Sequence, residues 1–256
     1  MPARTLFVGL DAFDPFLLER WSAEGRLPRY ASLTRDAAAF SLSSPLAAIG
    51  AGLWQELITG RSCGRLGYSC RARQLHTGET AVRRVETHEV DPRAFWTAVS
   101  DEGKRVAVID LPQSVRPPEL NGVFGGGWGI HDRLFGQHSL PPDLFGELRA
   151  RHGDYPLWSR PWLRQTTAAC DGHDGSPEAY EYLLDDLLAG IELKTDLLLD
   201  VLGRDEWDLF ACAFGEGQCS GHQLWHFYDA RRRKVMTASP TASGASTSAS
   251  IPPWAG

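Results

Sequence analysis

The sequence predicts an α/β fold in which a mostly parallel, doubly wound sheet is flanked by helices. Three segments carry this prediction, residues 5–10, 104–111 and 207–214, which are rich in consecutive apolar and β-branched residues. Such runs are typical of strands that are buried on both faces of a parallel sheet. Segments with helical periodicity separate the three runs, and this alternation of strands and helices is the pattern of a doubly wound sheet.

The first predicted strand ends in a carboxylate. Asp11 comes directly after the apolar run, and Asp14 follows it closely. The carboxyl ends of the strands in an open α/β sheet border the ligand crevice, so a carboxylate at this point is placed for metal or phosphate chemistry. The alternative is that Asp11 or Asp14 caps the next helix, and this segment alone does not decide between the two roles.

Helices and loops follow in the N-terminal half. Pro15 at a first helical position predicts a short amphipathic helix, and a second short helix is predicted over residues 28–35. Alternating residues over 37–42 predict a strand. Residues 49–59 predict a helix that begins after a loop of small residues and points its first N–H groups at the crevice. The polar, Arg-rich segment 61–88 predicts a loop with an edge hairpin.

The middle of the chain continues the alternation. Residues 91–102 predict a helix, and the second strand that follows ends in Asp110. The glycine run within residues 123–132 lacks the fixed spacing of phosphate-binding loops, so it predicts a close-packed turn. Residues 141–152 predict a helix, and the Pro- and Trp-rich segment 155–167 predicts an irregular lid or pocket wall.

The longest predicted helix covers residues 176–202. Ser176 is placed as its N-cap and Pro177 at its first position. The apolar face of this helix is predicted to pack in the core, and it consists of Leu183, Leu184, Leu187, Leu188, Ile191, Leu198 and Val201.

A second group of metal-capable residues follows the third strand. Glu216, His222 and His226 lie shortly after its end. Carboxylates and imidazoles are common ligands of divalent metals. The alternative is that the two histidines, which are four residues apart, have a structural role.

Composition excludes several classes of function. The formal net charge is −6 and the only basic run is 231–234, which argues against binding to duplex nucleic acid. No apolar stretch approaches the length of about 20 residues that a membrane-spanning helix needs. The N-terminus leads into a predicted strand rather than a secretory signal. We therefore expect a cytoplasmic protein without a membrane partner. Its five cysteines have no zinc-finger spacing and are expected to be reduced thiols.

The chain divides into two regions. Residues 1–230 are long enough for one α/β domain with a sizeable core. Residues 231–256 combine the basic run with a tract rich in Ser, Ala, Thr and Pro, which cannot bury a core and predicts a disordered tail.

Three segments in chain order carry a family resemblance: VGLDAFDPFLLERWSAEGRLPRYASL, SSPLAAIGAGLWQELITGRSCGRLGY and WDLFACAFGEGQCSGHQLWH. The chain resembles the type I phosphodiesterase and nucleotide pyrophosphatase branch of the alkaline phosphatase superfamily, from about residue 6 to about residue 229. The resemblance implies an alkaline phosphatase-like sheet, of which this chain holds the N-terminal part. It also implies two divalent metals, usually zinc, at the carboxyl edge of the sheet, and hydrolysis of a phosphodiester or a nucleotide.

Position by position, the resemblance makes Asp11 and His222 metal ligands. It places Gly50 where the family has its nucleophile, and glycine has no oxygen that could attack phosphorus, so no residue is assigned as catalytic. The family's metal-binding carboxylate four residues before His222 is Gln218 here, a much poorer ligand. Glu216 is the candidate to replace it.

Three functions stay open. The first is a metal-dependent phosphoester hydrolase, impaired at Gly50. The second is a catalytically inactive remnant or binding protein that keeps the fold. The third is a thiol-dependent enzyme that uses Cys219 beside His222.

The remaining metal ligands of the family have no counterpart before the tail. The change of composition near Asp229 is expected of a truncated or frameshifted coding sequence, and the alternative is a genuine short form with another role. A sheet interrupted in this way leaves an unpaired edge and an uncovered apolar face, so we expect poor solubility or dependence on a partner.

Overall fold

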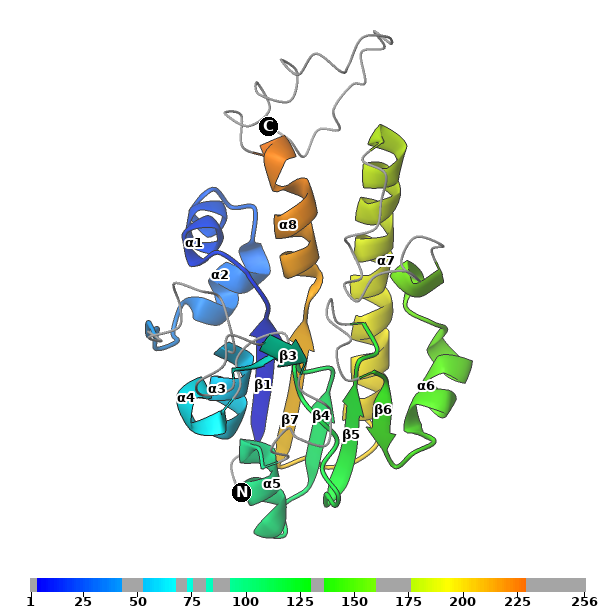
Figure 1. Cartoon of the computed structure of the whole chain (residues 1–256). Coiled ribbons are helices and arrows are strands. Elements are labelled where there is room, and N and C mark those ends of the chain that lie inside the picture. The colour runs from blue at the N-terminus through cyan, green and yellow to red at the C-terminus, as the bar shows by residue number, and fades with distance from the viewer. Residues whose placement is uncertain are drawn as a thin grey trace, which may run out of the picture.

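A five-stranded sheet forms the centre of the computed structural model (Figure 1). The structure describes residues 4–42, 53–67, 73–75, 82–84, 93–129, 136–159 and 176–228. The strand order is β1-β7-β4-β5-β6. The strands are β1 (Thr5–Leu10), β7 (Leu209–Phe214), β4 (Val106–Ile109), β5 (Gly122–Gly126) and β6 (His138–Leu140). All neighbours are parallel except β5 and β6, which are antiparallel. The prediction of an α/β protein with a mostly parallel sheet flanked by helices is confirmed.

Helices cover both faces of the sheet. On one face, which we call the α7 face, lie α6 (Leu144–His152) and α7 (Pro177–Leu202). On the other, the α5 face, lie α3 (Leu53–Thr59) and α5 (Phe95–Asp101). In Figure 1, α1 (Pro15–Ala23), α2 (Pro28–Thr34) and α8 (Glu216–Tyr228) lie beyond the carboxyl ends of β1 and β7.

Strand β7 shows why β4 and β7 are apolar throughout, whereas the prediction that β1 is buried on both faces is wrong, because Leu6, Val8 and Leu10 are exposed. Phe210 and Cys212 are buried with the residues of α7, whereas Leu209 and Ala211 are buried in a second cluster that includes Trp96 of α5. Successive side chains of a strand point to opposite faces, so a strand covered on both faces needs apolar residues at every position.

The helix ends agree with the sequence signals. The carboxylate of Asp14 accepts hydrogen bonds from the backbone N–H groups of Phe16 at 2.8 Å and Leu17 at 3.2 Å, so Asp14 caps α1. Ser176 accepts a hydrogen bond from the N–H of Ala179 at 3.2 Å and caps α7 as predicted.

Two predicted elements are wrong. Residues 37–42 form no strand, and Phe40 and Leu42 are 87% and 90% exposed. A strand needs a hydrogen-bonded partner, and none of the described strands pairs with this segment.

The glycine run predicted as a turn begins instead as β5, parallel to β4. Glycine is needed there because a Cβ on Gly125 would lie 2.8 Å from Cζ of Phe145.

The apolar face predicted for α7 is right only in part. Four of its residues are buried, but Leu188 is 53% exposed, and the buried side of the helix includes Asp186 and Lys194. Lys194 is tolerated in the interior because Asp110 and Glu216, from distant parts of the chain, pair with it. A helical pattern does not reveal such partners.

Several smaller elements complete the description. The hairpin predicted within residues 61–88 is confirmed as β2 (Arg73–Leu75) and β3 (Val82–Arg84), which form a separate antiparallel pair. Helix α4 (Cys63–Leu66) and the 3-10 turn η3 (Pro156–Ser159) were not predicted. No helix in the described ranges is long and apolar enough to cross a membrane. The predicted tail, residues 231–256, lies outside the described residues.

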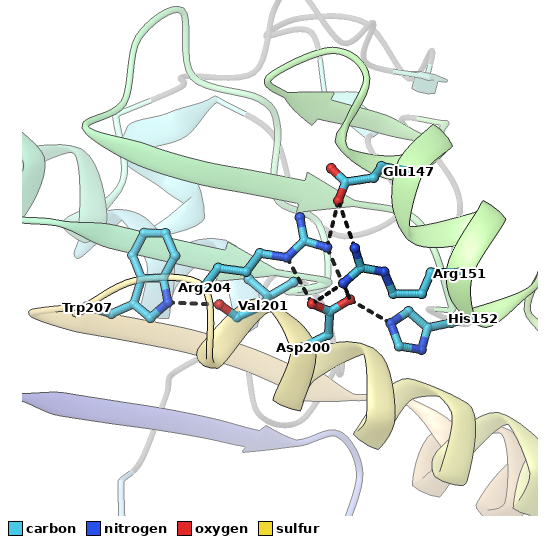
Figure 2. Close-up of polar contacts among 7 residues, drawn as sticks. All are labelled: Glu147, Arg151, His152, Asp200, Val201, Arg204 and Trp207. Atoms are coloured by element: carbon cyan, nitrogen blue, oxygen red, sulfur yellow. Dashed lines mark hydrogen bonds and ion pairs between the residues drawn. The ribbon is translucent and has the colours of Figure 1, made fainter.

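An ion network ties α6 to α7 near the amino ends of the strands (Figure 2). Asp200 of α7 is 2.9 Å from Nη1 of Arg151 and 2.8 Å from Nε2 of His152, both on α6. Arg204 approaches Asp200 at 3.1 Å, and it also lies 3.2 Å from Glu147 of α6. These contacts fix the flank of α7 that carries Asp200 against α6.

Candidate functional site

Three neighbouring parallel strands are each followed by a carboxylate at the same edge of the sheet. Asp11 follows β1, Glu216 comes shortly after β7, and Asp110 follows β4. Because the strands are parallel, their carboxyl ends meet at one edge, where ligands bind in open α/β sheets. This edge is therefore the candidate functional site.

Asp11 is held by a tryptophan from the α5 face. Its Oδ1 accepts a hydrogen bond from Nε1 of Trp54 at 2.9 Å, and its backbone N–H donates to the carbonyl of Phe214 at 2.9 Å. The indole passes over Gly9, where a Cβ would lie 2.5 Å from Cη2 of Trp54. Glycine in β1 therefore allows Trp54 to reach and orient the Asp11 carboxylate.

On the α7 face, Lys194 joins the other two carboxylates. Its Nζ lies 2.9 Å from Oδ2 of Asp110 and 3.4 Å from Oε1 of Glu216, and it donates to the carbonyl of Ala213 at 3.3 Å. Lys194 and Asp110 are fully buried, and Glu216 is 3% exposed. Buried charges are tolerated only when they are paired and hydrogen-bonded, and Lys194 meets that requirement for both carboxylates.

Asp110 is satisfied by the glycine run as well as by the lysine. Its two oxygens accept hydrogen bonds from the backbone N–H groups of Trp128 at 2.8 Å and Gly129 at 2.9 Å. The residue itself has φ of 59°, an uncommon value outside glycine. The glycine run thus binds a carboxylate of the same chain.

Glu216 is less completely satisfied. Its Oε1 accepts a hydrogen bond from the hydroxyl of Tyr155 at 3.0 Å in addition to its contact with Lys194. Its Oε2 has no hydrogen-bond partner among the described residues. One oxygen of Glu216 is therefore buried without a donor from the described residues.

The pKa shifts follow from this arrangement. Burial by itself lowers the pKa of Lys194, but the charges of Asp110 and Glu216 and the hydrogen bonds to them outweigh burial and raise it, so the lysine is charged. Burial, and then the charge of Glu216, raises the pKa of Tyr155 well above its usual value. The tyrosine is therefore a neutral donor at physiological pH.

Two glycines let the Tyr155 ring close over the cluster. A Cβ on Gly190 of α7 would overlap the ring, and a Cβ on Gly129 would lie 2.8 Å from its Cδ2. The ring also makes an edge contact with Trp128 at a centroid distance of 5.2 Å. Tyr155 is 2% exposed, so the cluster is sealed from solvent on this side.

The structure does not bring the sequence-predicted ligands together. Asp11 bonds to Trp54 on the α5 face, Glu216 bonds to Lys194 and Tyr155 on the α7 face, and His222 is exposed on α8. Within the described ranges, no group of three or more His, Cys, Asp and Glu residues is arranged to hold a metal ion. Gly50 lies outside the described residues.

The described residues fit a divalent metal only in part. Asp11 supplies a carboxylate at the place that the resemblance implies, and carboxylate oxygens suit divalent cations. The other implied ligands do not gather around Asp11 within the described part of the chain. The metal site therefore stays a prediction.

The structure gives no support to a thiol-dependent enzyme. Cys219 is 2% exposed, which closes its thiol to a substrate. Burial raises the pKa of the neighbouring Cys212 to about 11, so that thiol stays protonated.

Sequence reasoning missed Lys194 and Tyr155 as members of the cluster. The one available signal for Lys194 was its position on the apolar side of a long helix, where an unpaired lysine would be costly. Tyr155 stood in a segment without regular structure, so no pattern indicated its partners.

Comparisons of the chain with protein-family models, with curated proteins and with solved structures gave no match.

Proposed function

We propose that this chain is a phosphodiesterase-like or nucleotide pyrophosphatase-like protein that takes a phosphoester at the carboxyl edge of β1 and β7. In this proposal its sheet is an alkaline phosphatase-like one, and Asp11 holds a divalent metal, zinc by resemblance. One observation carries the proposal: the three segments of the family resemblance meet at this edge. Asp11 of the first segment bonds to Trp54 of the second and to Phe214 of the third.

Each residue at the edge has a role that its contacts support. Trp54 orients the carboxylate of Asp11 through its indole N–H. Helix α8 begins at Glu216, directly after β7, so its first N–H groups favour an anionic phosphoryl group at the same edge. A bound divalent metal would supply positive charge that stabilises the phosphoryl oxygens.

A second candidate is a protein that binds a phosphoester without hydrolysing it. Gly50 cannot attack phosphorus, and Gln218 is a poor metal ligand. Glu216 could replace Gln218 only by leaving its contacts with Lys194 and Tyr155 on the α7 face. This last observation favours binding over turnover.

Metal and substrate assays with two matched variants test both candidates. Zinc binding to the full chain is measured by titration calorimetry, and turnover is measured with bis(p-nitrophenyl) phosphate. Asp11→Asn removes the proposed ligand. Asp14→Asn makes the same chemical change nearby, at a carboxylate whose observed contacts cap α1.

The two candidates give different results. A hydrolase binds zinc and turns over the diester, and Asp11→Asn abolishes both while Asp14→Asn retains both. A non-hydrolysing protein binds zinc with the same dependence on Asp11 but shows no turnover. Absence of zinc binding by the unaltered protein would contradict both candidates.

A further inference from the structure

Among the described elements, none covers the α7 face of β1. Leu6, Val8 and Leu10 point to this face, and they are 61%, 48% and 41% exposed. Their neighbours in register on β7 include Phe210 and Cys212, which are buried beneath α7. Helix α7 therefore covers β7 but leaves β1 open, and β1 pairs only with β7 among the described strands.

Helix α7 carries an exposed apolar stripe beside this open face. Leu188, Leu199 and Leu202 are 53%, 59% and 39% exposed, and Ile191 between them is half-buried. Their spacing places them along one side of the helix at 3.6 residues per turn. We call this stripe and the three β1 residues together the β1–α7 corner.

The side of α7 on which the stripe lies follows from the ion network. Asp200 projects from the flank of α7 that contacts Arg151 and His152 of α6 (Figure 2). Helix α6 packs beside β5 and β6, at the far edge of the sheet from β1. At 100° per residue the stripe lies on the opposite flank from Asp200, so it faces the β1 side.

A row of acidic residues borders the stripe on the solvent side of α7. Glu181, Asp185, Glu192 and Asp196 are all exposed. None of them forms an ion pair with another residue in the described ranges, whereas Asp200 on the other flank is paired with two arginines. The corner thus combines a strand face, a helix stripe and an uncompensated negative border.

We propose that the β1–α7 corner binds an amphipathic helix of another polypeptide whose apolar face is flanked by Lys or Arg. A helix beside α7 would cover Leu6, Val8 and Leu10, as α7 covers β7. The apolar stripe of α7 would pack against the side of the bound helix, as in a helix pair. The acidic row would attract Lys or Arg at the flank of that helix.

A second copy of this chain is a poorer occupant. In a symmetric pair, a second copy would present its own α7 stripe, which carries the same acidic border. Packing two such stripes together would place acidic rows near one another, and like charges across an interface are unfavourable. Charge therefore distinguishes a basic partner from self-association.

Two synthetic helices of about 18 residues test the proposal. They share one apolar face, and its flanking positions are Lys in one peptide and Glu in the other. Binding to the full chain is measured by fluorescence anisotropy of labelled peptide. We expect the Lys peptide to bind at least about tenfold more tightly than the Glu peptide, and the difference to shrink as salt is raised.

Variants of the protein locate the binding surface. Glu192→Lys with Asp196→Lys alters only exposed residues, leaves two negative and two positive charges in the row, and is expected to abolish the preference between the two peptides. Val8→Lys places a charge on the open strand face and is expected to weaken both peptides. Leu33→Lys is the matched control, because Leu33 is a 79% exposed leucine on α2, outside the corner, and should change neither affinity.

Several outcomes would overturn the proposal. They are equal affinity or no affinity of the unaltered protein for the two peptides, an unchanged preference in the variant with Glu192→Lys and Asp196→Lys, and a loss with Leu33→Lys as large as with Val8→Lys. A concentration-dependent dimer in analytical ultracentrifugation that is lost in Val8→Lys would assign the corner to a second copy instead.

Discussion

Replacement of Lys194 by methionine is expected to destabilise the protein because it leaves two buried carboxylates without their shared cation. Asp110 would keep its hydrogen bonds from Trp128 and Gly129, and Glu216 would keep the one from Tyr155. Removing one partner of a buried ion pair costs about 3–5 kcal/mol. The remaining hydrogen bonds place the expected loss near the lower end, at about 3 kcal/mol.

Urea unfolding followed by far-UV circular dichroism measures this loss. With a slope m of about 2 kcal/mol per molar urea, a loss of about 3 kcal/mol lowers the midpoint by about 1.5 M. Lys104→Met is the matched control. Lys104 is about half exposed, and its Nζ forms a long ion pair of 3.7 Å with Oδ1 of Asp208. A surface pair of this kind is worth less than about 1 kcal/mol.

A second substitution tests whether charge is the cause. Glu216→Gln in the Lys194→Met background removes one of the two uncompensated charges and is expected to recover about 1–2 kcal/mol. A loss below about 1 kcal/mol in Lys194→Met, or further destabilisation by Glu216→Gln, would refute the electrostatic account of the cluster.

The same lysine predicts an alkaline limit to stability. Its pKa is raised in the folded protein, so its contribution is fully present below its ordinary pKa of 10.5 and is lost as the pH rises through the folded value. Tyr155, whose pKa is also raised, loses stabilisation in the same direction. Unfolding measured from pH 8 to 11.5 should show a decline from about pH 10 that is smaller in Lys194→Met.

Two further predictions concern packing and the ion network. Gly190→Ala should destabilise the protein by about 1–3 kcal/mol, because the new methyl group overlaps the ring of Tyr155. Gly146→Ala on α6 is the control: its methyl group meets no neighbour within 4 Å, and it should stabilise the protein by up to about 1 kcal/mol. Thermal unfolding of the two variants distinguishes these outcomes. The hydrogen bond from Arg204, with those from neighbouring groups, holds the pKa of Asp200 far below its ordinary value of 3.8. Asp200→Asn should therefore cost about 2 kcal/mol at pH 7, and the difference from the unaltered protein should shrink as the pH falls below 3.8; a difference that does not change with pH would contradict this assignment.

Much of the fold could be predicted from local patterns. Pro15, Asp14 and Ser176 mark helix starts through their own local chemistry, and the apolar runs of β4 and β7 indicate strands covered on both faces. These features depend on residues close in sequence, so a single sequence is sufficient to indicate them.

The candidate site could be predicted only as a set of positions. The sequence placed Asp11, Asp110 and Glu216 after strands, and parallel strands bring such positions to one edge. It could not show which face each side chain takes. Trp54 draws Asp11 to the α5 face, while Lys194 and Tyr155 hold Glu216 on the α7 face.

The sequence by itself determined that this protein is built on apolar parallel strands with carboxylates at their ends, because strand burial and strand termination are local properties of the chain. Only the tertiary structure decided the partners of those carboxylates and the face that α7 leaves open. Lys194 meets Asp110 through a contact between residues far apart in the chain, and no periodicity in either segment encodes that meeting. The exposure of Leu6, Val8 and Leu10 likewise depends on where α7 lies, although their sequence is that of a buried strand.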